Sequence, residues 1–151
     1  MSTERSTTTV PAGGEPKGTP IRSVLAIVGG WITLFVLGQL FLGVIASTMP
    51  GDIPSGEGTQ PTERGLAIWL AGMLPNGIVA GVITARLAGW APIAHAAVLG
   101  GIIGFFGMVS SDEARGLPAW FAIGRALMPV VSIVLGGVVA RAIDVRRGKR
   151  A

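Results

Sequence analysis

The sequence contains no cysteine, no tyrosine and a single histidine. Without cysteine there is no disulfide framework, thiolate metal site or cysteine nucleophile. One histidine also excludes a metal site built from several imidazoles of one chain. Charged residues make up only 13% of the chain, about half of their usual share in soluble domains. We therefore expect no metal or other cofactor and no soluble globular domain.

Hydrophobic residues, by contrast, make up 50% of the 151 residues, and the mean hydropathy is +0.64. The few charges lie in clusters, and the apolar runs between them are long enough to cross a bilayer. The run from Val24 to Met49, for example, has 26 residues and no charge. The composition therefore predicts a small all-α, polytopic membrane protein.

The net charge is +4, with a pI near 11.1. A nucleic-acid partner is not expected, because there is no basic groove with aromatic platforms. The basic residues instead crowd the end of the chain, directly after an apolar segment: Arg141, Arg146, Arg147, Lys149 and Arg150. Such a basic tail is typical of a cytoplasmic flank.

Four transmembrane helices are predicted, at about 23–49, 65–87, 92–109 and 118–141, within a membrane domain of residues 22–142. Residues 1–21 are polar and rich in Gly, Pro, Ser and Thr, which predicts a disordered cytoplasmic tail, and residues 143–151 form the basic cytoplasmic tail. Gly89 suits a helix C-terminus with positive φ, and Pro92 suits the first turn of the next helix. The second and third helices should therefore form a tight hairpin.

The fourth span is interrupted by Arg125. Either one continuous helix begins near Pro118 and carries Arg125 in its outer third, or residues 118–124 lie at the membrane interface. The positions of Pro118 and Trp120 favour the continuous helix.

The distribution of basic residues predicts the orientation. Four spans place both termini on one side, together with nine basic residues: Arg5, Lys17, Arg22, Arg86, Arg141, Arg146, Arg147, Lys149 and Arg150. The other side has three: Arg64, Arg115 and Arg125. The positive-inside rule therefore predicts a multi-pass protein of the cell (inner) membrane with both termini in the cytoplasm.

The second and fourth spans are similar in sequence near their ends. Ile78–Arg86 reads IVAGVITAR and Ile133–Arg141 reads IVLGGVVAR, with five of nine positions identical at an offset of 55. Each span also has a proline upstream, Pro75 and Pro129. Either two helical hairpins are related as a parallel internal repeat, or apolar helices ending in Arg resemble each other by composition.

Small residues at i, i+4 spacing occur on every predicted helix, and such stripes let helices approach closely in a bilayer. The stripes are Gln39-Gly43-Ser47 (with Gly30 and Gly38 on the same predicted helix), Gly77-Gly81-Ala85, Ala96-Gly100-Gly104 and Ser132-Gly136-Ala140. They predict packing within a tight bundle, with a homodimer face as the alternative.

Four polar residues within the spans are candidate functional residues, because polar groups are costly there. Arg125 has two candidate partners, the loop acids Asp112 and Glu113 or a phospholipid phosphate reached by snorkelling. Gln39 and Asn76 either hydrogen-bond to each other between helices, bond the carbonyl freed by Pro75, or line a polar path. His95 lies near the cytoplasmic face, where it is either an interface residue or a proton relay.

The segment from Ala80 to Gly101, AGVITARLAGWAPIAHAAVLGG, resembles one in a group of uncharacterised small four-helix bacterial membrane proteins. Their pattern G-x-x-x-A-R-x-A-G followed by His-Ala corresponds here to Gly81, Ala85, Arg86, Ala88, Gly89, His95 and Ala96. The resemblance covers about 22 residues and implies a four-span fold but no activity.

No acidic residue lies inside a predicted span, which argues against a proton-coupled transporter, and no catalytic motif is present. We therefore expect a non-catalytic structural or accessory protein rather than an enzyme. The alternative is a small oligomeric transporter or channel. The expected partners are the lipid bilayer and either a second copy of the chain or an unidentified membrane protein.

Overall fold

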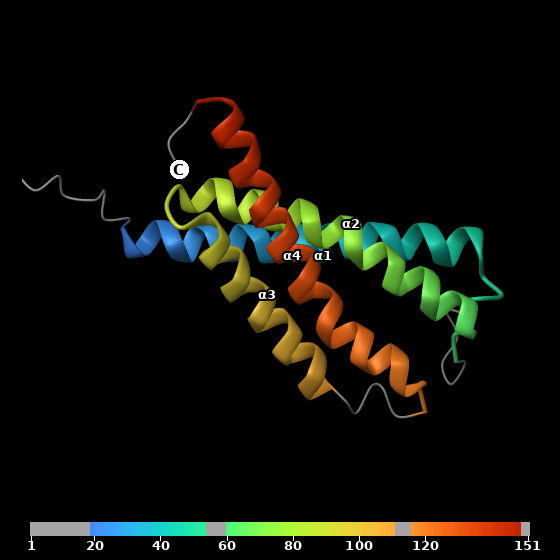
Figure 1. Ribbon diagram of the computed structural model, residues 1–151. Coiled ribbons are helices and arrows are strands. Elements are labelled where there is room, and N and C mark those ends of the chain that lie inside the picture. Colours follow the sequence, from blue (N-terminus) through green and yellow to red (C-terminus); the bar gives the residue numbers. More distant parts are fainter. Residues whose placement is uncertain (1–18, 54–59, 111–115, 149–151) are drawn as a thin grey trace, which may run out of the picture.

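The computed structural model describes residues 19–53, 60–110 and 116–148, and every regular element in these ranges is a helix (Figure 1). The helices are α1 (Pro20–Thr48), α2 (Glu63–Ala88), α3 (Pro92–Val109) and α4 (Ala119–Arg146). Each is long and apolar enough to cross a membrane. The prediction of an all-α, multi-pass membrane protein is thus confirmed.

The helix boundaries differ from the predicted spans by a few residues. α1 begins at Pro20, inside the predicted tail, and α4 extends to Arg146. α4 runs without interruption through Arg125, which confirms one continuous helix. Residues 1–18 and 149–151 of the two predicted tails lie outside the described residues, as do Asp112 and Glu113.

Local sequence signals explain where the helices start and stop. Thr62 precedes α2, and its Oγ1 accepts a hydrogen bond from the backbone N–H of Gly65 (3.1 Å), as an N-cap does. α2 ends at Gly89, whose φ of 71° is a left-handed conformation that favours glycine. Pro92 is the first residue of α3. The predicted turn between α2 and α3 is therefore present.

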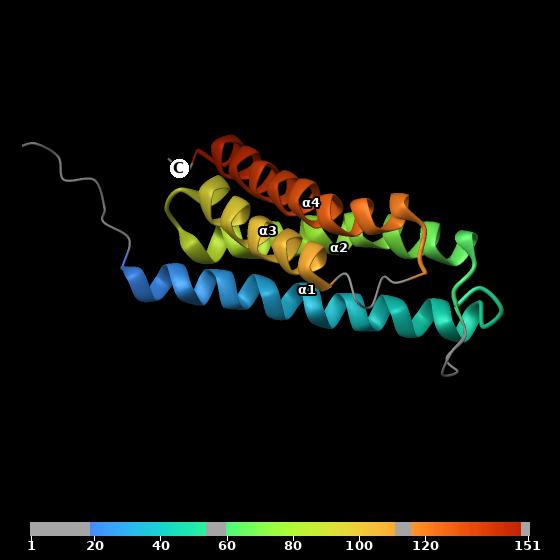
Figure 2. The same ribbon diagram turned by 90° about the horizontal axis from the view of Figure 1, so that it is seen from below.

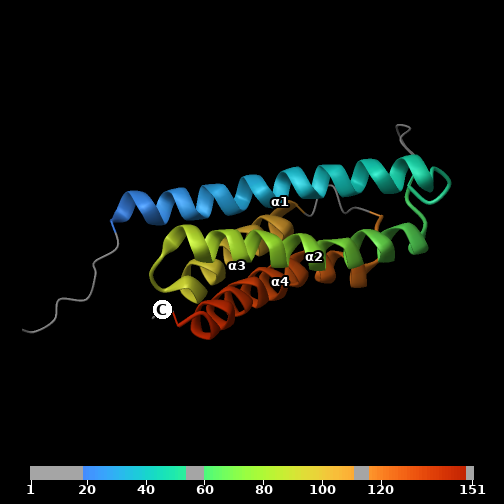
Figure 3. The ribbon, with the colours of Figure 1, turned by 90° about the horizontal axis from the view of Figure 1, so that it is seen from above.

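α2 and α4 run in the same general direction and cross each other (Figure 1), and α2 lies between α1 and α4 (Figures 2 and 3). α3 packs along α4, whereas α1 packs along α2, touches α3 and barely meets α4. The start of α1 and the end of α4 lie at the same end of the bundle, together with the α2–α3 turn (Figure 2). We refer to this as the termini end, and to the end holding Thr48, Glu63, Val109 and Ala119 as the opposite end.

The crossing of α2 and α4 is close enough for backbone to meet backbone. A Cβ atom at Gly81 would overlap the carbonyl oxygen of Ile133, and one at Gly136 would overlap that of Ile78. One turn away, a Cβ at Gly77 would overlap Ser132 Oγ. Only hydrogen side chains leave room for this approach.

These contacts follow the sequence repeat. At the offset of 55, Ile78 corresponds to Ile133 and Gly81 corresponds to Gly136. The contact of Gly81 with the Ile133 carbonyl is therefore equivalent to the contact of Gly136 with the Ile78 carbonyl. The crossing therefore has a local two-fold relation between parallel helices, as an internal repeat predicts. The relation is confined to this crossing, because α1 and α3 differ in length (29 and 18 residues) and in neighbours.

The predicted stripes of α3 and α4 also lie at helix contacts. Gly100 and Gly104 of α3 are buried against Val130 of α4, and Ala96 lies beside Gly137. The interface between α3 and α4 is therefore formed by small residues on α3 as well as on α4.

The small residues predicted to pack on α1 are only partly at helix contacts. Gly30 is buried against Thr84 and Leu99, whereas Gln39, Gly43 and Ser47 are exposed. The Phe41 ring of α1 lies against α2, where a Cβ at Gly72 would overlap it. The prediction was wrong for the Gln39-Gly43-Ser47 stripe because a large side chain can pack over a glycine of the partner helix, and i, i+4 spacing within one helix does not reveal that arrangement.

Candidate functional site

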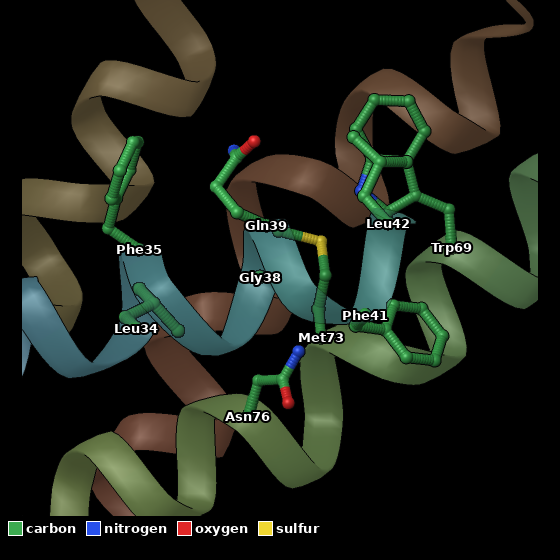
Figure 4. A pocket seen from close by; sticks show the side chains of 9 residues that line it. All are labelled: Leu34, Phe35, Gly38, Gln39, Phe41, Leu42, Trp69, Met73 and Asn76. Atoms are coloured by element: carbon green, nitrogen blue, oxygen red, sulfur yellow. The ribbon is translucent and has the colours of Figure 1, made fainter. Parts of the chain in front are cut away.

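Gln39 of α1 and Asn76 of α2 line the same cavity, of about 170 Å³, between these two helices. Figure 4 shows its nine lining residues, including Trp69 and Met73 of α2. We refer to it as the amide cavity. Apart from the two amides, the cavity is lined by glycine and by apolar and aromatic side chains.

The two amides point in different directions. In Figure 4 the Gln39 amide extends away from α2, whereas the Asn76 amide lies on the α2 side near Met73. In the described part of the chain, neither side chain forms a hydrogen bond within the bundle. The two amides therefore line a common cavity, and in the described residues they do not form the predicted hydrogen bond with each other.

A second, larger cavity of about 390 Å³ adjoins the first, and Met73 lines both. All four helices contribute to its wall, with residues that include Trp31, Met73, Ile103, Phe106, Arg125 and Pro129. We refer to it as the arginine crevice. Of these residues, Trp31 of α1 and Phe106 of α3 are the most exposed (51% and 61%). The crevice is therefore most open on the side where α1 and α3 face each other.

Arg125 holds the end of α3. Its Nη2 donates to the carbonyl oxygens of Ser110 (2.8 Å) and Gly107 (3.3 Å). The last carbonyls of a helix have no partner within the helix and carry partial negative charge. A guanidinium from α4 therefore stabilises the C-terminus of α3 and ties the two helices together at the opposite end.

Arg22 makes the corresponding contact at the termini end. Its Nε donates to the carbonyl oxygen of Leu87 in the last turn of α2 (3.0 Å). From the sequence, Arg22 was expected only to contribute to the excess of positive charge on the cytoplasmic side. Its position in the first turn of α1, opposite the end of α2 in a hairpin, is the signal that could have predicted the contact.

His95 lies at the termini end, far from the other candidates along the helix axes. It is 7% exposed, its Nδ1 lies 3.0 Å from the carbonyl oxygen of Ala91, and Trp90 contacts it edge to face at 5.1 Å. These contacts attach the first turn of α3 to the preceding turn. His95 thus has a local role in helix packing that accounts for its burial.

The structure therefore separates the four candidate polar residues into two groups. Gln39, Asn76 and Arg125 line two adjoining cavities towards the opposite end, whereas His95 belongs to the α2–α3 turn. Sequence reasoning missed Met73 and Trp31, which line these cavities. Nothing in their spacing distinguishes them from lipid-facing residues.

In comparisons with known protein families, curated proteins and solved structures, none matches this chain.

Proposed function

We propose that this chain is a non-catalytic structural or accessory protein of the cell (inner) membrane, of the same group of small four-helix bacterial proteins that its α2–α3 hairpin resembles. The close crossing of α2 and α4 is the observation that carries the proposal. Because Gly81 and Gly136 abut opposing backbone, this crossing leaves no room for a solute path between the two central helices. The architecture favours a role in assembly over conduction through one chain.

The charges at the two ends support an orientation with both termini in the cytoplasm. Among the described residues, the termini end carries Arg22, Arg86, Arg141, Arg146 and Arg147, whereas the opposite end carries Arg64 and Arg125. Arg64 is paired with Asp52 at 3.8 Å. Positive charge in excess at one end favours that end for the cytoplasm.

Native mass spectrometry of the protein, purified from its own membranes in mild detergent, tests the accessory role. We expect a second membrane polypeptide at a fixed ratio, retained through a second purification step. A chain that is recovered only with itself would contradict the proposal.

The second candidate function is transport by an oligomer, and the adjoining amide cavity and arginine crevice favour it. Gln39, Asn76 and Arg125 line these cavities, and a second copy beside α1 would enclose them. Replacing Gln39 and Asn76 by leucine separates the two functions. In an accessory protein the change alters stability or partner recovery, whereas in a transporter it abolishes flux in reconstituted vesicles while the fold is retained.

A further inference from the structure

A further cavity, of about 300 Å³, is an open groove at the termini end, between the starts of α1 and α3. We refer to it as the histidine groove. Its lining includes Ser23 and Ile27 of α1, Trp90 of the α2–α3 turn, and His95 and Val98 of α3. Because α1 and α3 both begin at this end, the two polar side chains lie about one helical turn nearer to it than Ile27 and Val98. The wall therefore changes from polar to apolar towards the middle of the bundle.

The polar part of the histidine groove lies at the level expected for lipid headgroups. Trp90 is 41% exposed there, and exposed tryptophan is typical of the boundary between a membrane and water. α1 touches α3 but packs mainly along α2, so the groove between their first turns faces outwards. Lipid can therefore reach it from the side of the bundle.

His95 contributes a hydrogen-bond acceptor to the lining. Its Nδ1 lies 3.0 Å from the carbonyl oxygen of Ala91, and because a carbonyl can only accept, Nδ1 carries the hydrogen. In the neutral ring, Nε2 then holds a lone pair. His95 is only 7% exposed, yet its Nε2 is accessible and has no hydrogen-bond partner in the described part of the chain. A ligand that fits this nitrogen must offer an N–H or O–H donor.

The α1 side of the groove has the opposite requirement. The Ser23 hydroxyl makes no hydrogen bond with any of the described residues, so it is free to donate to an anionic oxygen. The neighbouring Arg22 donates from Nε to the Leu87 carbonyl, and its Nη2 lies beside Gly89, the residue before Trp90. The groove therefore offers a donor and a nearby cation on one wall and an accepting nitrogen on the other.

We propose that the histidine groove binds one phosphatidylethanolamine. Its ammonium donates to His95 Nε2, its phosphate accepts from Ser23, and one acyl chain lies along Ile27 and Val98. A primary ammonium has three N–H donors and no acceptor, whereas a phosphate oxygen accepts, so this zwitterion satisfies both walls. The site does not depend on whether the protein is an accessory subunit or a transporter.

The volume and the lining favour this lipid over other occupants. The 300 Å³ of the groove is at the lower end of the range of roughly 300–1,000 Å³ found for ligand pockets, enough for a headgroup and the start of one chain. A helix of a second copy, about 10 Å across, displaces roughly 800 Å³ over a length of 10 Å. Water is a poor occupant of the inner part, because Ile27, Ala94 and Val98 offer it no polar side chain.

Native mass spectrometry of the full-length, delipidated protein tests the proposal by separate titrations with dioleoyl-phosphatidylethanolamine and dioleoyl-phosphatidylcholine. The two lipids have the same tails and the same charges, but the quaternary ammonium of phosphatidylcholine has no N–H. We expect the first phosphatidylethanolamine to bind about 5-fold or more tightly than phosphatidylcholine, as one hydrogen bond to a charged group predicts.

Two substitutions of His95 test the assigned nitrogen. The short amide of His95→Asn can still donate to the Ala91 carbonyl but has no acceptor at the position of Nε2, so the preference for phosphatidylethanolamine should fall to within about 2-fold. The longer amide of His95→Gln reaches that position and should retain part of the preference. A purely structural role for His95 would change the affinities for the two lipids equally.

A second pair of variants leaves His95 intact, in case its substitution prevents folding. Ala94 and Ala97 are both exposed on α3, but only Ala94 lines the groove. Ala94→Leu should weaken phosphatidylethanolamine binding about 5-fold because the added side chain fills the groove, whereas Ala97→Leu should leave it within about 2-fold. Equal binding of the two lipids by the unmodified protein, an unchanged preference in His95→Asn, or equal losses in the two alanine variants would overturn the proposal. A stable dimer that excludes the lipid would also overturn it.

Discussion

α1 and α4 are almost equal in length, at 29 and 28 residues, and equally apolar, yet they are packed very differently. In the most apolar stretch of α4, 39% of the residues are buried, whereas the value for α1 is 11%. α4 packs against both α2 and α3, while α1 lies along one side of α2 (Figure 3). Apolar character alone therefore does not decide which helix is most buried.

The difference follows from the position of small residues. Lipid tails are as apolar as leucine, so close packing rather than hydrophobicity drives helix association in a bilayer. α4 buries Ser132, Gly136 and Gly137 against its neighbours, whereas Gly38 and Gly43 of α1 have nothing within 4 Å of an added Cβ. Small residues act as packing sites only where a neighbouring helix approaches them.

The largest effect is expected from Gly136→Leu. The added side chain would meet the carbonyl of Ile78 and the Cα of Gly81, and backbone cannot move aside without separating α2 from α4. We expect a loss of about 3 kcal/mol or more in the free energy of unfolding. Unfolding in mixed micelles with increasing SDS, followed by circular dichroism, measures this loss. A stability equal to that of the unmodified protein would contradict the central role of the crossing.

Gly30→Leu tests the closest approach of α1 to the rest of the bundle. A Cβ there would overlap Thr84 Oγ1 and come within 2.6 Å of Leu99 Cδ2. Because side chains rather than backbone are in the way, we expect a smaller loss, of about 2 kcal/mol. Limited proteolysis of the loop between α1 and α2 should accelerate as α1 separates. A loss of stability greater than that of Gly136→Leu would contradict the conclusion that α4 is packed more closely into the bundle than α1.

Arg125→Gln should uncouple α4 from the end of α3. Removing two charge-assisted hydrogen bonds to Gly107 and Ser110 should cost about 1.5 kcal/mol. Hydrogen exchange should increase in the last turn of α3 and remain unchanged in α2. The matched variant Arg22→Gln, which removes one exposed bond to Leu87, should cost about 0.5 kcal/mol.

Gly43→Leu should have the smallest effect, because an added Cβ at Gly43 has nothing within 4 Å. We expect a change within about 0.5 kcal/mol, measured by the same SDS titration. A marked loss of stability, or loss of a co-purified partner, would show that this face of α1 contacts another polypeptide.

Much of the fold could be predicted from the sequence. The four helices, the turn at Gly89 and Pro92, and the continuous α4 follow from span length, turn chemistry and the need to satisfy backbone groups inside a membrane. These features depend on neighbouring residues along the chain, which is why they can be derived from it. The small residues Gly81 and Gly136 were predicted to pack within the bundle, but the sequence did not predict that they pack against each other's helices.

The candidate site was less predictable. Gln39, Asn76 and Arg125 stood out because polar groups are rare in such helices, but their contacts did not follow. The sequence suggested the loop acids Asp112 and Glu113 or lipid for Arg125, and these acids lie outside the described residues. The hydrogen bonds from its Nη2 to the end of α3 were not predicted. That contact depends on where α3 ends relative to α4, and this is a property of how the two helices are packed.

Local sequence thus specifies that this chain forms four apolar helices and where each of them turns. The packing of the helices specifies which small residues are buried, which is why Gly136 lies at a backbone contact while Gly43 of α1 does not. It also creates the crevice beside Arg125, since that cavity exists only where α1 departs from α3 and α4. Helix formation is governed by contacts within a few residues, whereas helix association requires matched surfaces from distant parts of the chain.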